Sequence, residues 1–289
     1  VVWVDGESAG VGGWGGRGRE SRAAMKVFLG NSPWSTQGMY GVRAGSRWPH
    51  FENSNHEYMP FPFFLAYATA VLEQDDQHVL LVDGIAERLT DDEFYDRVVG
   101  FCPDLVVLEV STPSIKTDQR HWKHVRDLLG PDVKIALCGI HHHMQDPVWL
   151  DDHPEVDFVF VGEYEYTLRD LVRRLDAGEP VDGIDGLVHR DADGAPTSNG
   201  KRPLIKDLDE LPWPSRHMLP MYDYRDEPGS IARPSVQMWA SRGCPYRCSF
   251  CAWPQIMYGG FKYRTRDVVD VIDETEWLPR AVRMVLDAV

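Results

Sequence analysis

The chain has 289 residues with 45 acidic and 30 basic side chains, so its formal net charge is −15. This acidic balance argues against nonspecific nucleic-acid binding, which needs a basic surface, and we expect no nucleic-acid partner. The sequence contains no run of about 18 apolar residues, the length that a transmembrane helix needs, so we expect no transmembrane helix. Three of the five cysteines lie within eight residues, which indicates a metal or redox site in a reducing compartment rather than a secreted disulfide framework. We therefore expect a cytoplasmic protein.

Residues 1–24 differ from the rest in composition. They contain seven of the 25 glycines and lack the basic start and apolar core of a signal peptide. A strand-like segment, Lys26–Gly30, follows Met25 directly. We expect Met25 to be the true start and residues 1–24 to be a disordered or non-native leader.

Short apolar runs alternate with helical patterns between Met25 and Ala177. Each run is continuous and bounded by Gly, Pro or Asp, which is typical of strands buried on both faces of a parallel sheet. The predicted strands are Val27–Leu29, Val79–Val82, Leu105–Leu108, Val133–Leu137 and Phe158–Val161. This pattern predicts an α/β fold, with a five-stranded doubly wound parallel sheet over residues 25–178.

Helix signals fill the intervals between these strands. Pro62 can begin a helix because its missing N–H is harmless in the first turn. Thr90–Glu93 forms a capping box, and Asp118 can cap a helix that carries Trp122. The apolar residues of the last helix recur at helical spacing: Leu168, Leu171, Val172 and Leu175.

A change of pattern follows, over residues 179–235. Ile184–Arg190 and Lys201–Ile205 flank the turn signal Asp191–Gly194, which predicts a small hairpin. Leu211–Arg216 is a proline-punctuated linker of the kind that separates domains. We expect a further domain over residues 236–289.

The strongest signal is a cysteine motif in this last part. Cys244, Cys248 and Cys251 have the spacing C-x3-C-x2-C and follow a candidate strand, Val236–Ala240. Three thiolates close in sequence can hold an iron–sulfur cluster, and a four-iron cluster with three protein ligands leaves one iron open to a small molecule. Zinc is a weaker alternative because structural zinc sites usually take four ligands in two pairs. Chance clustering of structural cysteines is an equally weak alternative. The motif also differs from that of bacterial ferredoxins, which use a different spacing and a fourth cysteine.

At these residues the sequence resembles the radical S-adenosylmethionine (SAM) superfamily, whose signature is C-x3-C-x-aromatic-C. The resemblance implies a [4Fe–4S] cluster on the three cysteines, which chelates SAM and yields a 5′-deoxyadenosyl radical after one-electron reduction. Phe250 supplies the aromatic residue and would lie beside the adenine of SAM. An electron donor such as flavodoxin or ferredoxin is implied. Thr265–Ile272 would be the first helix of a partial (βα)6 barrel, capped by Thr265.

The resemblance extends upstream, to about residue 25, because an α/β domain and a proline-rich linker ahead of the motif are similar to the layout of cobalamin-binding radical SAM proteins. The local matches are Asn31-Ser32-Pro33, Pro62–Ala68, Val82-Asp83-Gly84, Ser111–Ser114, Gly139 and Gly162–Glu165. The resemblance implies cobalamin contacts at Asn31, Asp83, Gly84, Ser111, Thr112, Gly139, His141, Gly162 and Glu163. The D-x-H-x-x-G motif, whose histidine ligates cobalt, does not occur. Cobalamin would therefore be bound without a histidine ligand, or the domain would bind no corrin.

Three further segments leave alternatives open. His141–His143 could contact a corrin or a metal, or form a polar loop with at most one histidine facing a ligand. Tyr258–Arg264 could bind an anionic substrate group or form a solvated loop. Trp253–Gln255 could shape the SAM pocket or only pack; with Tyr258–Arg264 it resembles hopanoid-associated radical SAM proteins, which implies a lipid-linked substrate.

The end of the chain bears on activity. After Cys251 only 289 − 251 = 38 residues remain, whereas a full (βα)8 barrel takes about 250 residues. We expect a second strand at Val282–Val289 and half a barrel with an open edge, hence a C-terminally truncated fragment that is inactive alone. The intact enzyme would methylate an unactivated carbon, or rearrange or cyclise a lipid or natural-product intermediate. The alternatives are a non-catalytic cobalamin-binding module or, more weakly, an electron-transfer iron–sulfur protein.

Overall fold

The computed structural model describes residues 24–36, 39–42, 52–53, 58–226, 236–246, 248–260 and 262–286. Apart from its last residue, the leader expected at residues 1–24 lies outside these ranges. Among the described residues, no helix is both long and apolar enough to cross a membrane.

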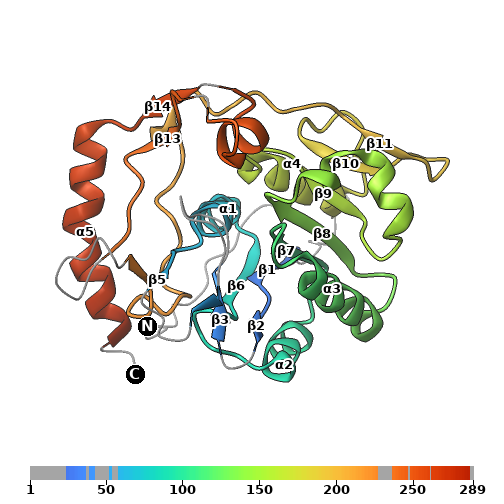
Figure 1. The fold of residues 1–289 in the computed structure, drawn as a ribbon, viewed down its shortest axis with the longest axis horizontal. Helices are drawn as coiled ribbons and strands as arrows, with labels where there is room; N and C mark the ends of the chain where they lie inside the picture. The colour runs from blue at the N-terminus through green and yellow to red at the C-terminus, as the bar shows by residue number, and fades with distance from the viewer. Residues whose placement is uncertain are drawn as a thin grey trace, which may run out of the picture.

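A seven-stranded sheet forms the centre of the fold, in the order β11-β10-β9-β8-β7-β1-β6 (Figure 1). Within this sheet, strands β1, β6, β7, β8 and β9 are parallel, and β10 and β11 continue it in antiparallel pairing. The bounds are β1 Lys26–Asn31, β6 His78–Asp83, β7 Leu105–Val110, β8 Lys134–Gly139, β9 Phe158–Phe160, β10 Leu187–Arg190 and β11 Pro196–Ser198.

The α/β class and the mostly parallel sheet are confirmed, and the five predicted strands coincide with β1, β6, β7, β8 and β9. The sheet has seven strands rather than five because the predicted hairpin joins it. The second hairpin strand is Pro196–Ser198 and not Lys201–Ile205, since the turn at Asp191–Gly194 is tight and pairs Arg190 with Pro196 directly.

Helices cover both faces of the sheet. Apolar residues of α1 and α4 pack in one core cluster, and those of α2 and α3 pack in a second cluster on the opposite face. The bounds are α1 Phe63–Gln74, α2 Asp91–Phe101, α3 Ile115–Leu129 and α4 Glu165–Ala177. Side chains of one strand alternate between the clusters, as Phe28 and Leu29 of β1 do, so both faces are buried.

The helix starts follow local chemistry. Thr90 forms the predicted capping box, with its hydroxyl accepting from the Glu93 N–H at 3.2 Å and the Glu93 carboxylate accepting from the Thr90 N–H at 2.8 Å. Asp118 was predicted as a cap but lies inside α3, which begins one turn earlier at Ile115. Its buried carboxylate accepts hydrogen bonds from serine hydroxyls instead.

Short elements complete this part of the chain. Turns of 3₁₀ helix, a π turn and two-to-three-residue strands connect the main elements. They are β2 Ser35–Thr36, β3 Met39–Gly41, β4 Glu52–Asn53, β5 Tyr58–Met59, η1 His142–Gln145, η2 Pro147–Asp152, η3 Leu208–Glu210, β12 Arg225–Asp226 and η4 Trp253–Met257.

The C-terminal part contains a two-stranded ribbon and a long helix, on the left of the view in Figure 1. Strands β13 (Ser241–Gly243) and β14 (Tyr263–Thr265) pair antiparallel, and α5 spans Val268–Leu286. Three predictions are corrected here. Residues 236–240 form no strand, residues 282–286 belong to α5 rather than to a second barrel strand, and Thr265 ends β14 rather than capping the helix. Asp267 takes the capping role, accepting from the Val269 N–H at 2.7 Å.

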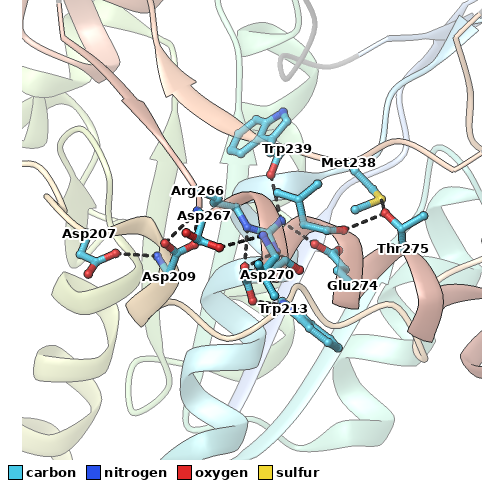
Figure 2. A network of polar contacts seen from close by, with 12 residues as sticks. Asp207, Asp209, Trp213, Met238, Trp239, Arg266, Asp267, Asp270, Glu274 and Thr275 are labelled. Carbon is cyan, nitrogen blue, oxygen red and sulfur yellow. Dashed lines mark hydrogen bonds and ion pairs between the residues drawn. The ribbon is translucent and has the colours of Figure 1, made fainter.

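The proline-rich linker is packed between α1 and α5. The Ser215 N–H donates to the Ala66 carbonyl at 3.0 Å, and the Trp213 Nε1–H donates to Asp270 at 2.9 Å. Figure 2 shows how Arg266 joins this network, with ion pairs of 2.5 Å to both Asp270 and Glu274. The described part of the linker is therefore fixed by polar contacts along much of its length.

Candidate functional site

The predicted corrin-contacting residues gather at one edge of the sheet. The carboxyl ends of parallel strands meet at the same edge, and ligands of open α/β sheets bind there. Asn31 and Asp83 end the adjacent strands β1 and β6, Ser111 follows β7, Gly139 ends β8 and Gly162 follows β9. The fold thus brings residues from five separate segments to one edge.

The turn after β1 presents an unsatisfied polar atom. Asn31 is buried, and its side-chain Oδ1 has no hydrogen-bond partner among the described residues. The Gly84 N–H donates to the Asn31 carbonyl at 2.9 Å. A Cβ at Gly84 would lie 3.0 Å from both that carbonyl and Pro33, so the close approach favours glycine.

Asp83 is held by the protein itself. Its Oδ1 accepts from the N–H groups of Ile85 and Ala86, each at 3.2 Å, and its Oδ2 accepts from the Tyr224 hydroxyl at 3.0 Å. Burial, with the Asp83 charge as a further cause, raises the pKa of Tyr224 well above its usual value. Asp83 therefore shapes the turn after β6, and its predicted cobalamin contact stays a prediction.

A buried hydroxyl and carboxylate cluster follows β7. The hydroxyls of Ser111 and Ser114 lie 2.6 Å apart, and Ser114 donates to Asp118 at 2.7 Å. Next to it, Thr112 Oγ1 lies 3.3 Å from His141 Nδ1. Burial and the neighbouring His143 lower the pKa of His141.

His141 differs from the two histidines that follow it. It is buried, whereas His142 and His143 are exposed. Of the three histidines only His141 is therefore buried, and the interpretations of this segment, as a ligand contact or as a polar loop, stay predictions. Among the described residues, no three His, Cys, Asp or Glu side chains are gathered as a metal site.

Two glycines allow close approach at this edge. Gly139 has a φ of +112°, and a Cβ there would lie 2.2 Å from the Val110 carbonyl. Gly162 has a φ of +76°, and its Cβ would lie 3.1 Å from the Met257 carbonyl, in the segment that follows the cysteines. Positive φ values of this kind favour glycine over other residues.

The turn after β9 and the first residue of α4 carry two buried carboxylates, Glu163 and Glu165, that bind arginines of the β13–β14 ribbon. Arg264 forms a bidentate pair with Glu163 at 2.6 and 2.8 Å, and Arg242 pairs with Glu165 at 2.6 Å. Burial raises the pKa of Glu165, and the Arg242 guanidinium opposes that shift. The Glu163 carboxylate, predicted as a cobalamin contact, is thus engaged by Arg264. Arg264 is therefore paired with a carboxylate, and the two interpretations of Tyr258–Arg264 stay predictions.

The cysteine motif lies on a loop between β13 and β14. Cys244 and Cys251 are half-buried and Cys248 is exposed, and all three are free thiols. Phe250 is 91% exposed. The side chain of Gln255 donates towards the carbonyl oxygens of Cys248, Ser249 and Cys251 at 3.0–3.3 Å, which fixes the backbone between the second and third cysteines.

These thiols fit an iron–sulfur cluster by their chemistry. The three described thiols are not gathered around one point in this structure, but three accessible cysteines on one short loop supply the thiolates that such clusters require. A fourth cysteine does not join them, because Cys102 is at the end of α2 and Cys138 is buried in β8. The loop therefore offers three thiolate ligands and an exposed aromatic ring beside them.

The contacts of several residues of the site were not predicted, although Glu165, Gln255 and Arg264 lie in segments that the sequence analysis named. Arg242 and Arg264 bind Glu165 and Glu163 across segments far apart in the sequence, and no local pattern predicts such pairs. Gln255 acts locally, on carbonyl groups four to seven residues before it. Arg242 lies two residues before Cys244, and Glu165 belongs to the Gly162–Glu165 match. The closeness of these residues in the sequence to the recognised motifs was the signal that could have pointed to them.

No protein-family profile matches the chain. Among curated proteins, an uncharacterised methyltransferase of Pyrococcus horikoshii is 30% identical over 213 residues, which cover 74% of this chain and 44% of that protein. Cytidylyl-2-hydroxyethylphosphonate methyltransferase of Streptomyces wedmorensis is 28% identical, with 74% of this chain and 47% of that protein covered. Anaerobic magnesium-protoporphyrin IX monomethyl ester cyclase of Rubrivivax gelatinosus is 28% identical, with 75% and 39% covered. The chain spans less than half the length of these relatives.

Two solved structures have a similar fold. The cobalamin-dependent SAM radical enzyme OxsB, with aqua-cobalamin and SAM bound, matches with a TM-score of 0.67 at 18% identity, over 91% of this chain and 32% of that chain. The radical SAM methyltransferase TsrM of Kitasatospora setae, with cobalamin and a [4Fe–4S] cluster bound, matches with a TM-score of 0.56 at 20% identity, over 88% and 46%. The comparisons confirm the resemblance predicted from the sequence: the chain is related to radical SAM proteins that carry a cobalamin-binding domain.

Proposed function

We propose that the chain acts in a cobalamin-dependent radical SAM enzyme that methylates, rearranges or cyclises a small-molecule or lipid-linked intermediate. One observation carries the proposal. The loop with the three cysteines is attached by buried ion pairs to the turn after β9, at the edge of the sheet where ligands of this fold class bind. Relatives that are named methyltransferases and a cyclase support the choice of reactions.

The cysteine loop would provide the radical chemistry. Cys244, Cys248 and Cys251 would hold a [4Fe–4S] cluster, which, when bound, supplies the electron that splits SAM into methionine and a 5′-deoxyadenosyl radical. Phe250 is free to stack on the adenine of SAM because its ring is 91% exposed. An external donor such as flavodoxin or ferredoxin would deliver the electron.

The edge of the sheet would bind cobalamin, which supplies a methyl group when bound. The unpartnered Oδ1 of Asn31 is a buried acceptor that suits an amide N–H of a corrin side chain. Gly139 and Gly162 let neighbouring backbone segments, at Val110 and Met257, pack closely at this edge. Thr112 and His141 offer polar atoms in the adjacent loops.

The proposal is tested by loading both cofactors on the full chain. The protein is reconstituted with iron and sulfide without oxygen, and hydroxocobalamin binding is followed by its absorption spectrum. We expect about four irons per chain on the stated cluster chemistry, and saturable corrin binding. Cys251→Ala should lose the cluster, whereas Cys102→Ala, an exposed cysteine outside the motif, should retain it.

Each outcome separates the candidate functions. A chain that binds hydroxocobalamin but no cluster would support the non-catalytic module and contradict the enzyme. A cluster that survives in Cys251→Ala would show that the motif does not hold it. Absence of both cofactors would refute the proposal.

A further inference from the structure

The turn Gly162–Glu165 touches both ends of the cysteine loop. Arg242 and Arg264 are directly opposite residues of the β13–β14 ribbon, and both reach this turn. Arg242 lies two residues before the first cysteine, and the Cys244 N–H donates to the Lys262 carbonyl at 2.9 Å across the same ribbon. The base of the loop is therefore fixed to the turn by two arginines.

The ionic contacts are buried and balanced in charge. Arg242 pairs with Glu165 at 2.6 Å and approaches Glu163 Oε1 at 3.6 Å, while Arg264 donates to both carboxylate oxygens of Glu163. Two guanidinium groups thus face two carboxylates. The Arg242 guanidinium also lies over the ring of Tyr67, 4.6 Å from its centroid. A charge removed from such a site leaves its partner buried and uncompensated, so loss of one partner should weaken the attachment of the ribbon to the turn.

The far end of the loop rests on the same turn. Met257 follows the third cysteine by six residues and is buried in the core beside the sheet. Its carbonyl lies so close to Gly162 that a Cβ there would be 3.1 Å away. The backbone of Gly162 and the side chains of Glu163 and Glu165 therefore support the loop from both of its ends.

We propose that the Gly162–Glu165 turn couples the cobalamin site to the cluster site, with Arg242, Arg264, Glu163 and Glu165 as positioning residues. This inference rests on the proposed function. The turn lies at the corrin-facing edge through its backbone, and it holds the cysteine loop through its carboxylates. A cofactor that holds the turn in place at one site also holds it in place for the other site. The factor by which the cluster raises the affinity for cobalamin must equal the factor by which cobalamin raises the affinity for the cluster.

The coupling also gives Glu163, which was predicted to contact cobalamin, a different role. The Glu163 carboxylate binds Arg264 and the Ile205 N–H, so it serves the docking of the cysteine loop. The contribution of this turn to a corrin would come from its backbone at Gly162.

The test measures one affinity in two states of the full chain. The dissociation constant of hydroxocobalamin is determined before and after reconstitution with iron and sulfide. The cluster-loaded chain should bind hydroxocobalamin about 10-fold tighter, within the usual range of coupling between sites. Bound hydroxocobalamin should slow the loss of iron to a chelator in the converse experiment.

Variants assign the coupling to the ion pairs. Glu165→Gln keeps the shape but removes the charge, and the affinity ratio should fall to about one. Arg242→Lys keeps the charge and should retain part of the ratio. Asp157→Asn is the matched control, because Asp157 binds Arg126 at 2.6 Å and the Ile135 N–H at the opposite edge of the sheet. It should lose stability without losing the ratio.

The outcomes separate this inference from the proposed function. If neither cofactor binds, the proposed function fails and the coupling with it. If both bind and the wild-type ratio is one, only the coupling is refuted. The coupling would also be refuted if Glu165→Gln kept the wild-type affinity ratio, or if Asp157→Asn lost the ratio as Glu165→Gln does. Thermal melts of each variant show that the chain is folded, and Arg242→Lys provides the test if Glu165→Gln does not fold.

Discussion

Gly243 directly precedes the first cysteine and offers a sharp test of the ribbon that holds the loop. Its φ is +93°, and a Cβ at this position would lie 1.7 Å from the Lys262 carbonyl oxygen. That oxygen also accepts the hydrogen bond from the Cys244 N–H. Gly243→Ala therefore places a methyl group where the opposite strand already lies.

The cost follows from two effects. A left-handed backbone costs a non-glycine residue about 1–2 kcal/mol, and loss of the Cys244 hydrogen bond costs about 0.5–1.5 kcal/mol. The Cβ and the Lys262 oxygen must also move apart by about 1.3 Å (3.0 − 1.7) to reach the shortest distance that real contacts show. We expect a destabilisation of about 2–3 kcal/mol and a displaced Cys244.

Urea unfolding and iron loading after anaerobic reconstitution measure the two consequences. Gly100→Ala is the control, because a Cβ at Gly100 meets nothing within 4 Å on the surface of α2; it should be neutral or slightly stabilising. If Gly243→Ala matched the wild type in both stability and iron content, the reasoning about the ribbon would be refuted.

Three further predictions concern the α/β part and the linker. Gly139→Ala should cost about 1–3 kcal/mol, since its φ is +112° and its Cβ would lie 2.2 Å from the Val110 carbonyl; an unchanged urea midpoint would contradict this. Thr90→Ala should cost about 1 kcal/mol by removing the capping box, and Thr90→Ser should restore most of it, as unfolding curves will show. The hydrogen bond to Glu73 raises the pKa of His217. The stability from this pair is present below about pH 6.5 and is lost as pH rises through the raised pKa; His217→Gln should remove this part of the pH dependence, and an NMR titration of His217 showing no upward shift would contradict it.

Much of the α/β part could be predicted because its signals are local. The strands β1 and β7 are short apolar runs between breakers, and the Thr90 capping box is written in four consecutive residues. The periodicity of α4 likewise appears in the sequence alone. Each of these features is decided by neighbouring residues, so long-range contacts did not change the outcome.

The errors arose where local patterns are ambiguous. The run Met284-Val285-Leu286 is apolar enough for a buried strand but continues the helix α5, and a short apolar run does not distinguish the two. Fewer contacts of the site could be predicted, because its ion pairs join residues about 75–100 positions apart, such as Arg242 with Glu165 and Arg264 with Glu163. Sequence spacing carries no information on such pairs.

The central claim is that Cys244, Cys248 and Cys251 hold a [4Fe–4S] cluster that binds SAM. The most direct measurement is an electron paramagnetic resonance spectrum of the anaerobically reconstituted, dithionite-reduced chain, recorded with and without SAM. We expect the signal of a reduced [4Fe–4S] cluster whose g values shift when SAM is added, and no such signal in Cys248→Ala. A spectrum without a cluster signal, or one that SAM leaves unchanged, would contradict it.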